Sequence, residues 1–313
     1  MPTEIYNVTI FDINLTINPI AFTIPFINWS IHWYGIILAT GFFLAIVYGM
    51  KNAKRFGVDP DKMIDVILVT APISILCART YYVIFDDQGS INSIAEFFGF
   101  GTGFSGIAIY GAVIGAFACG AIMCKIKKIK ILDLADLAAL GFLIGQGIGR
   151  WGNFMNQEAF GSPTGSSWWG MTSENVVALF NKLGYDTEAL AHPCFLYESI
   201  WCILGFFILH KLSKKRHFSG EIVLMYCVWY GFERAIVENL RTDSLGPGDL
   251  RISVVVSIIL FVGAAITLIV IRKKQKTAII GENYAAVFED EYDALETNED
   301  NVEDTVLEEN TNE

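Results

Sequence analysis

Long apolar runs separated by short charged stretches dominate the chain. A helix of about 20 apolar residues crosses the hydrocarbon core of a bilayer, and seven runs approach or exceed that length. They cover residues 31–50, 64–85, 107–124, 131–149, 194–212, 222–240 and 252–271. The fourth run is the least regular, because Asp133 and Asp136 lie near its start. The pattern predicts an all-α integral membrane protein with about seven transmembrane helices.

The basic residues predict how these helices are oriented. Lysine and arginine cluster after the first, third, fifth and seventh runs, and cytoplasmic loops carry an excess of both. The residues concerned are Lys51, Lys54, Arg55, Lys62, Lys125, Lys127, Lys128, Lys130, Lys211, Lys214, Lys215, Arg216, Arg272, Lys273, Lys274 and Lys276. We therefore expect the N-terminus outside the cell and the C-terminus in the cytoplasm.

Three segments differ in composition from the apolar body at residues 31–276. Residues 1–30 mix β-branched and aromatic residues with Asn and Pro, which favours an extracytoplasmic arm at the membrane interface. Residues 151–193 are polar and predict a small extracytoplasmic head between the fourth and fifth helices. Residues 277–313 contain thirteen acidic residues and neither Lys nor Arg, so we expect a disordered cytoplasmic tail.

The composition agrees with a membrane protein and argues against several other classes. Hydrophobic residues make up 53% of the chain and charged residues 18%, against about 45–50% and about 25% in soluble proteins. The net charge of -11 comes largely from the acidic tail, so nothing indicates nucleic-acid binding. The six cysteines form neither a CxxC pair nor a Cys/His metal pattern. We expect neither a metal site nor a cofactor.

The densest polar motif is residues 149–161, at the end of the fourth run. Arg150 offers a planar donor fork that suits a phosphate. Asn153 and Asn156 add neutral donors and acceptors, and Glu158 adds a carboxylate. A lone arginine here would most simply be an interfacial side chain that reaches the water. Four polar side chains set among glycines favour a ligand site.

A second motif, residues 230–241, closes the sixth run. Arg234, Glu238 and Arg241 fall on one narrow helix face at about 100° per residue. A structural Arg234–Glu238 ion pair is the plainer interpretation. An arginine inside a span is nevertheless costly unless it is paired or lines a wet cavity, and two arginines with one glutamate leave a positive face for an anion.

Three further motifs lie near the outer ends of runs, at residues 32–35, 105–115 and 192–198. Taken singly, their aromatic residues are typical of the interfacial belt and their glycines of close helix packing. Arg79, inside the second run, needs a partner that the sequence does not identify. Together the polar groups predict an outer cavity that holds an anionic head group while apolar walls take acyl chains.

These motifs resemble those of one known family. Residues 149–161 are similar to the signature of the prolipoprotein diacylglyceryl transferases. Residues 32–35, 192–198 and 230–241 resemble further motifs of that family in the same order, and the resemblance covers about residues 25–275. It implies an enzyme of the bacterial plasma membrane, with several spans and its active site toward the extracytoplasmic side.

The resemblance also implies the reaction. Such an enzyme transfers the sn-1,2-diacylglyceryl group of phosphatidylglycerol to the lipobox cysteine thiol of a preprolipoprotein and releases glycerol 1-phosphate. Its partners are phosphatidylglycerol, lipobox peptides and membrane lipid, with no nucleic acid. Carried over by position, the catalytic residues are Arg150, Arg234, Tyr110 and Glu238. The substrate-binding residues are Tyr34, Asn153, Asn156, Glu158, Gly161, Arg241 and His192.

One position departs from the family pattern. Many members carry a histidine in a His-Gly-Gly-Leu motif, where this chain has Tyr110 followed by Gly111. A tyrosine is a poorer base than a histidine at neutral pH. Tyr110 could only hydrogen-bond the substrate, could be ionised with help from an arginine, or the histidine is not the base in any member. We expect Tyr110 to orient the substrate while another group takes the thiol proton.

Two other functions compete with the transferase. Intramembrane Arg and Glu also mark transport paths, but here the charges cluster on one side and no inverted repeat is evident. A lipid-binding relative without activity is the second alternative. Tyr110 favours it, whereas Arg150, Asn153 and Arg234 count against it. Formation of a lipidated product separates both alternatives from the transferase.

Overall fold

The computed structural model describes residues 5–26, 29–85, 97, 108–242 and 252–274. The chain divides into two compact units, each described below by itself. The first comprises Met1–Gly49 and Asp136–Glu282, and the second comprises Met50–Ala135 and Asn283–Glu313. The predicted acidic tail lies outside the described residues.

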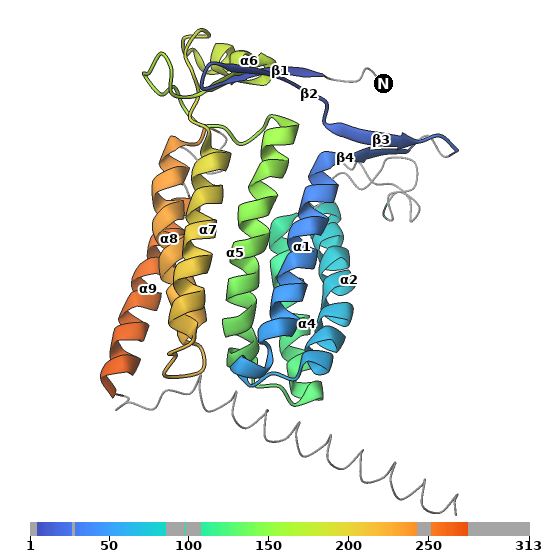
Figure 1. The fold of residues 1–313 in the computed structure, drawn as a ribbon, viewed down its shortest axis with the longest axis vertical. Coiled ribbons are helices and arrows are strands. Elements are labelled where there is room, and N and C mark those ends of the chain that lie inside the picture. The colour runs from blue at the N-terminus through green and yellow to red at the C-terminus, as the bar shows by residue number, and fades with distance from the viewer. Residues whose placement is uncertain (1–4, 27–28, 86–96, 98–107, 243–251, 275–313) are drawn as a thin grey trace, which may run out of the picture. The chain divides into compact units, whose positions relative to one another are not determined.

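All seven predicted runs form helices. Eight α-helices occur in the described part of the chain (Figure 1): α1 (Trp33–Asn52), α2 (Pro60–Phe85), α4 (Ile109–Lys127), α5 (Ile131–Asn156), α6 (Glu174–Leu183), α7 (Cys194–Ser213), α8 (Glu221–Leu240) and α9 (Ile252–Lys274). Of these, α1, α2, α4, α5, α7 and α9 are long and apolar enough to cross a membrane. The prediction of an all-α, multi-pass membrane protein is confirmed. The remaining predicted span, the sixth run, forms α8, which is 20 residues long but carries Glu233, Arg234 and Glu238.

Small residues bring the membrane helices of the first unit together. A Cβ on Gly205 of α7 would collide with the Trp229 indole of α8. The rings of Trp201 and Trp229 stack at 4.4 Å, and each indole N–H donates to the other residue's carbonyl, at 3.2 and 3.1 Å. Farther along α8, a Cβ on Gly231 would lie 2.9 Å from the Ser257 carbonyl of α9. The helices α7, α8 and α9 therefore run side by side (Figure 1).

The irregular acidic start of the fourth run has a structural explanation at Asp136. Its Oδ2 accepts from Arg216 Nη1 at 2.8 Å, and both side chains are fully buried. The same carboxylate accepts from the backbone N–H groups of Gly220 and Val223, both at 2.9 Å. Asp136 thus accepts hydrogen bonds from backbone N–H groups at the start of α8, where such donors have no partner within the helix. Arg216, which the charge pattern placed among the cytoplasmic anchors, is buried in this pair.

The N-terminal arm forms strands and joins the head. The strands are β1 (Tyr6–Ile10), β2 (Ile13–Ile17), β3 (Ile20–Ile24), β4 (Trp29–His32) and, in the head, β5 (Met171–Ser173). β1 pairs antiparallel with both β2 and β5, and β3 pairs with β4. The β-branched residues that marked the arm in the sequence favour this geometry. Val8, Phe154, Met171, Val176 and Phe180 form part of a common core, so the arm, the head and the end of α5 pack as one body.

In the second unit, α2 and α4 pack closely through glycine. A Cβ on Gly111 would collide with the Cys77 carbonyl, and one on Gly115 would lie 2.7 Å from the Cys77 side chain. Close packing is therefore the structural role of these glycines. Arg79 also gains the partner that the sequence did not identify. Its Nε donates to the Phe97 carbonyl at 3.0 Å.

Candidate active site

The buried carboxylate of Glu198, on the second turn of α7, is the centre of an arginine cluster. Its Oε2 forms an ion pair with Arg150 of α5 and lies 3.7 Å from Nη1 of Arg234 on α8. Its Oε1 lies 3.6 Å from Nη1 of Arg241, the C-cap residue that follows α8. Glu198 itself is only 1% exposed. A buried charge requires compensation, and here three guanidinium groups surround one carboxylate.

Arg234 connects two carboxylates. Its Nη1 faces Glu198, while its Nη2 pairs with Glu238 one turn later on the same helix. The predicted Arg234–Glu238 ion pair is thus present, and it orients a guanidinium that also reaches across to α7. The side chains of Arg150, Arg234 and Arg241 keep 21%, 17% and 13% of their surface exposed. The three guanidinium-bearing side chains are therefore partly accessible to a ligand.

A third carboxyl group, that of Glu233, belongs to the same buried region. On α8, Glu233 does not share the helix face of Arg234, Glu238 and Arg241. In the structure, Glu233 is 4% exposed and interacts electrostatically with Glu198, Arg150 and Arg234. Its Oε1 makes no hydrogen bond among the described residues.

The end of α5 adds a second set of polar groups. The helix continues from the predicted end at residue 149 to Asn156, so Arg150 and Asn153 lie on its last two turns. Arg150 Nη1 donates to Asn153 Oδ1 at 3.4 Å, and Asn153 Nδ2 donates to Glu158 Oε1 at 2.8 Å. The left-handed backbone of Gln157 (φ 51°) reverses the chain after the helix and returns Glu158 to this position. A continuous polar row therefore runs from Arg150 to Glu158.

Tyr34, on the first turn of α1, closes one side of this row. A Cβ on Gly152 would lie 2.7 Å from Cδ2 of the Tyr34 ring, so the glycine lets the ring approach α5 closely. Tyr34 also interacts electrostatically with Glu158 and Arg150. The structure thus places Tyr34 with the signature residues.

Gly161 joins three segments that the sequence separates. Its N–H donates to the His192 carbonyl at 2.9 Å, and it forms an antiparallel bridge with Arg241. A Cβ at this position would lie 2.7 Å from His192 Cβ and 2.9 Å from both Cys194 Sγ and the Leu240 carbonyl. A glycine is therefore required for the approach that positions Arg241.

Two predicted site residues, His192 and Asn156, have no side-chain hydrogen bond or ion pair to the arginine cluster in the described part of the chain, and a third, Tyr110, belongs to the other unit. His192 Nδ1 lies 3.2 Å from the Tyr197 hydroxyl, which also accepts from Trp169 Nε1 at 2.7 Å. Burial lowers the pKa of His192, which favours its neutral form. Asn156, on the last turn of α5, makes no side-chain hydrogen bond within the described part of the chain. Tyr110 belongs to the second unit, where its ring centroid lies 6.4 Å from that of Tyr81.

Glu198 is the residue that sequence reasoning left without a role. The sequence contained a signal, since a glutamate inside an apolar run requires a partner. Its three partners come from the end of α5 and from two turns of α8. Spacing along one helix cannot identify contacts of that kind.

The arrangement is suited to an anion that offers pairs of acceptor oxygens to guanidinium groups. Guanidinium groups match phosphate oxygens in geometry as well as charge. The described residues contain no group of three potential ligands arranged to hold a metal ion.

Comparison with known proteins identifies a matching family. A family model described as prolipoprotein diacylglyceryl transferase matches residues 19–270, which include every candidate site residue. The phosphatidylglycerol–prolipoprotein diacylglyceryl transferase of Pediococcus pentosaceus is 43% identical over 266 residues, covering 83% of this chain and 93% of that protein. The enzyme of the same name from Limosilactobacillus reuteri is 40% identical over 265 residues, with coverages of 84% and 94%. That from Lysinibacillus sphaericus is 42% identical over 277 residues, with coverages of 85% and 96%.

Proposed function

Because the chain belongs to the prolipoprotein diacylglyceryl transferase family, we propose that it lipidates lipoprotein precursors at the extracytoplasmic side of a bacterial cell membrane. The substrates are phosphatidylglycerol and the cysteine thiol of the precursor's lipobox. The observation that carries the proposal is the convergence of Arg150, Arg234 and Arg241 on Glu198 at the head end of the bundle. Figure 1 shows this end, where α5 finishes and α7 begins beneath the head.

The reaction is a displacement at the carbon of the diacylglyceryl group that is bonded to the phosphate oxygen. A bond forms between the cysteine sulfur and this carbon, and the bond from the carbon to the phosphate oxygen breaks. Glycerol 1-phosphate leaves with the electron pair, and the thiol gives up its proton. The thiolate is the nucleophile, because the thiol is a weak one. The product is a thioether.

Arg150 and Arg234 bind the phosphate and stabilise the charge that develops on the leaving group. Donors held in a site of low dielectric are worth about 3–4 kcal/mol each in the transition state. Glu198 and Glu238 hold the guanidinium groups of the two arginines in position before the lipid binds. The positive cluster also favours the thiolate of an approaching cysteine.

The polar row at the end of α5 receives the glycerol part of the lipid head group. Asn153 offers both donors and acceptors, and the exposed Glu158 carboxylate accepts from a glycerol hydroxyl. Tyr34 and Arg241 lie on either side of the glycerol site, and Gly161 sets the position of Arg241. His192 presents a neutral imidazole, and Asn156 an amide, to the substrate. Tyr110 orients the substrate, and a different group takes the thiol proton.

The test is a product assay on purified protein in detergent. The protein is incubated with phosphatidylglycerol labelled in its acyl chains and with a synthetic lipobox peptide. We expect labelled thioether peptide and an equal amount of released glycerol 1-phosphate. A protein that binds the lipid but forms neither product would be a non-catalytic relative or a transporter, and the proposal would then be wrong.

A further inference from the structure

Glu233 is a buried carboxyl group to which the proposed reaction gives no role. It lies on α8 immediately before Arg234 and is 4% exposed. Its Oε1 makes no hydrogen bond among the described residues. Burial without hydrogen-bond donors is costly for an ionised carboxylate, so such surroundings favour the neutral, protonated form of the group.

Three helices surround this carboxyl group. Helices α5 and α7 are in direct contact, since the Ser199 hydroxyl donates to the Gly147 carbonyl at 2.8 Å. Helix α9, which packs against α8, carries charged residues only in its last turn. The titratable and charged groups that interact with Glu233 are Arg150 of α5, Glu198 and Cys202 of α7, and Tyr230 and Arg234 of α8.

The protonation of Glu233 decides whether the arginine cluster has a net positive charge. The three arginines bring three positive charges, and the carboxylates of Glu198 and Glu238, which pair with them, bring two negative ones. One positive charge therefore remains while Glu233 is protonated, and none remains once it is ionised. A phosphodiester carries one negative charge, which matches the first of these states.

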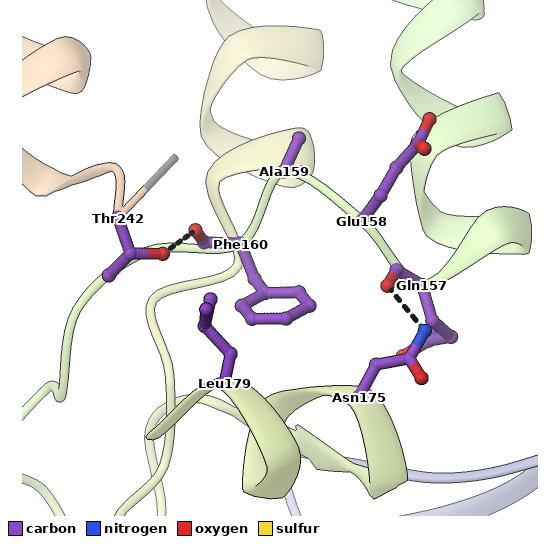
Figure 2. A pocket seen from close by; sticks show the side chains of 7 residues that line it. All are labelled: Gln157, Glu158, Ala159, Phe160, Asn175, Leu179 and Thr242. Carbon is purple, nitrogen blue, oxygen red and sulfur yellow. Dashed lines mark hydrogen bonds between the residues drawn. The ribbon is translucent and has the colours of Figure 1, made fainter. Parts of the chain in front are cut away.

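Glu158 is a further carboxylate near Arg150, but it is exposed to solvent. Figure 2 shows its carboxylate extending away from Phe160 and Leu179, which line a hollow of about 280 Å³ in the head. Water and salt screen an exposed charge far more than a buried one. The buried Glu233 therefore has the stronger influence on the arginines.

We propose that protonated Glu233 preserves the positive charge with which the arginine cluster binds the lipid phosphate, an inference that rests on the proposed binding of phosphatidylglycerol. Glu233 is a positioning residue, because it acts through Arg150 and Arg234 and does not itself contact the substrate. Its ionisation adds a negative charge beside the guanidinium groups and weakens their hold on an anionic head group. The affinity for phosphatidylglycerol is therefore high at low pH and falls as Glu233 loses its proton.

The test measures lipid affinity against pH without the peptide, so that no transfer takes place. Fluorescent phosphatidylglycerol is titrated into purified wild-type protein in detergent between about pH 5 and about pH 9, a range that includes the ionisation of buried carboxyl groups. We expect Kd to rise about tenfold with pH, because one charge is added close to the arginines. Fluorescent diacylglycerol, which has the acyl chains without the phosphate, should bind with the same Kd at every pH.

Three variants assign the pH dependence to Glu233. Glu233→Gln resembles the protonated group but cannot ionise, so its Kd should remain at the low-pH value of wild type throughout. Glu233→Asp restores a carboxyl group and should restore the rise in Kd. Glu221→Gln is the matched control and should keep the wild-type rise. Glu221 is also buried on α8, but it pairs with Arg272 and lies about 18 Å from Glu233 along the helix axis.

Infrared spectra of the wild-type protein give a readout that does not depend on the folding of any variant. They should contain the carbonyl band of a protonated carboxyl group at neutral pH, and this band should disappear over the pH range in which Kd rises. A wild-type protein without such a band, or with a Kd that does not change with pH, would overturn the role of Glu233.

The two proposals fail in different ways. If wild-type protein forms the lipidated peptide and Glu233→Gln shows the same rise in Kd as wild type, Glu233 does not set the charge of the cluster, although the transferase function stands. If the rise in Kd depends on Glu233 but no lipidated peptide forms, the role of Glu233 stands and the proposed reaction is wrong. A wild-type protein that does not bind phosphatidylglycerol at any pH would overturn both.

Discussion

At the scale of single residues, the site depends on a carboxylate that contacts three arginines. Removing one member of a buried ion pair costs about 3–5 kcal/mol, because it leaves the other charges uncompensated. Glu198 is 1% exposed, and its partners come from both α5 and α8. Its role is to hold guanidinium groups in place.

Glu198→Gln should therefore lower both stability and transfer. We expect kcat to fall about 100-fold, the size of losing one donor to a developing charge, and KM for phosphatidylglycerol to rise as the arginines lose their common anchor. The measurements are steady-state kinetics and thermal unfolding in detergent. Glu174→Gln is the control, since Glu174 binds Asn7 in the head, outside the cluster. Wild-type kinetics for Glu198→Gln would mean that Glu198 has no part in positioning the arginines.

Tyr110→Phe tests whether the tyrosine hydroxyl takes the thiol proton. Since we assign Tyr110 an orienting role, the variant should keep transfer within about tenfold of wild type, the size of one lost neutral hydrogen bond. Its pH–rate profile should keep its shape, because the proton acceptor is another group. Complete loss of transfer in Tyr110→Phe, with Tyr110→His active, would instead identify this position as the base.

The residues predicted from sequence and the one that was missed differ in where their partners lie. Arg234, Glu238 and Arg241 share one helix, so the 3.6-residue repeat was sufficient to group them. Glu198 has partners on two other helices, and spacing along the chain carries no information on contacts of that kind.

At the scale of elements, glycines lie where chain segments approach closely. These glycines differ in how much space an added Cβ would find. Gly161 holds the segments around His192 and Leu240 within van der Waals contact. Gly145, on α5, would meet nothing within 4 Å if a Cβ were added. The two positions form a matched pair for mutation.

Gly161→Ala should destabilise the protein by about 1–3 kcal/mol, the usual cost of overpacking, and reduce transfer because Arg241 is displaced. Gly145→Ala should be neutral or stabilising by up to about 1 kcal/mol, because a glycine inside a helix is unfavourable. Thermal unfolding and transfer assays on both variants check this. Equal effects at the two sites would contradict the role given to Gly161.

Helix existence was predictable at this scale, whereas helix ends were not. The apolar pattern ended the fourth run at residue 149, yet α5 continues to Asn156. Hydropathy marks where the chain leaves apolar surroundings, and a helix can continue into polar ones. The last two turns carry Arg150 and Asn153, so these proposed site residues are held more rigidly than a loop would allow.

At the scale of the whole molecule, ion pairs occupy both ends of α5 and serve different purposes. Asp136 and Arg150 lie about 21 Å apart along the helix axis at 1.5 Å per residue. The Asp136–Arg216 pair is fully buried and satisfies backbone donors at the start of α8. The cluster around Arg150 is partly exposed. We interpret the first as structural and the second as catalytic.

Asp136→Asn should consequently lower the free energy of unfolding by about 3–5 kcal/mol, while protein that remains folded keeps a near-normal KM for phosphatidylglycerol. The double variant Asp136→Leu with Arg216→Met should recover part of that stability, because it leaves no buried charge unpaired. Unfolding measured by intrinsic fluorescence, with transfer measured at low temperature, tests both statements. A selective loss of lipid binding in Asp136→Asn would contradict the division into two roles.

The sequence was most informative about the membrane body and least about the head. Seven apolar runs became seven helices, because about 20 consecutive apolar residues leave few alternatives in a bilayer. The pairing of β1 with β5 joins Val8 to Ser173. Short strands so distant in the chain lack a local pattern that pairs them, so the head core and its hollow emerged only in three dimensions.

Phosphate binding by the arginines around Glu198 is tested most directly by comparing three variants in membranes. Arg150→Ala and Arg234→Ala are assayed for transfer of labelled diacylglyceryl to a lipobox peptide, beside Lys182→Ala, a basic residue at the end of the head helix α6. We expect Arg150→Ala and Arg234→Ala to lose transfer at normal protein levels, whereas Lys182→Ala should retain it. Near-full activity of either arginine variant would show that the cluster around Glu198 does not bind the phosphate.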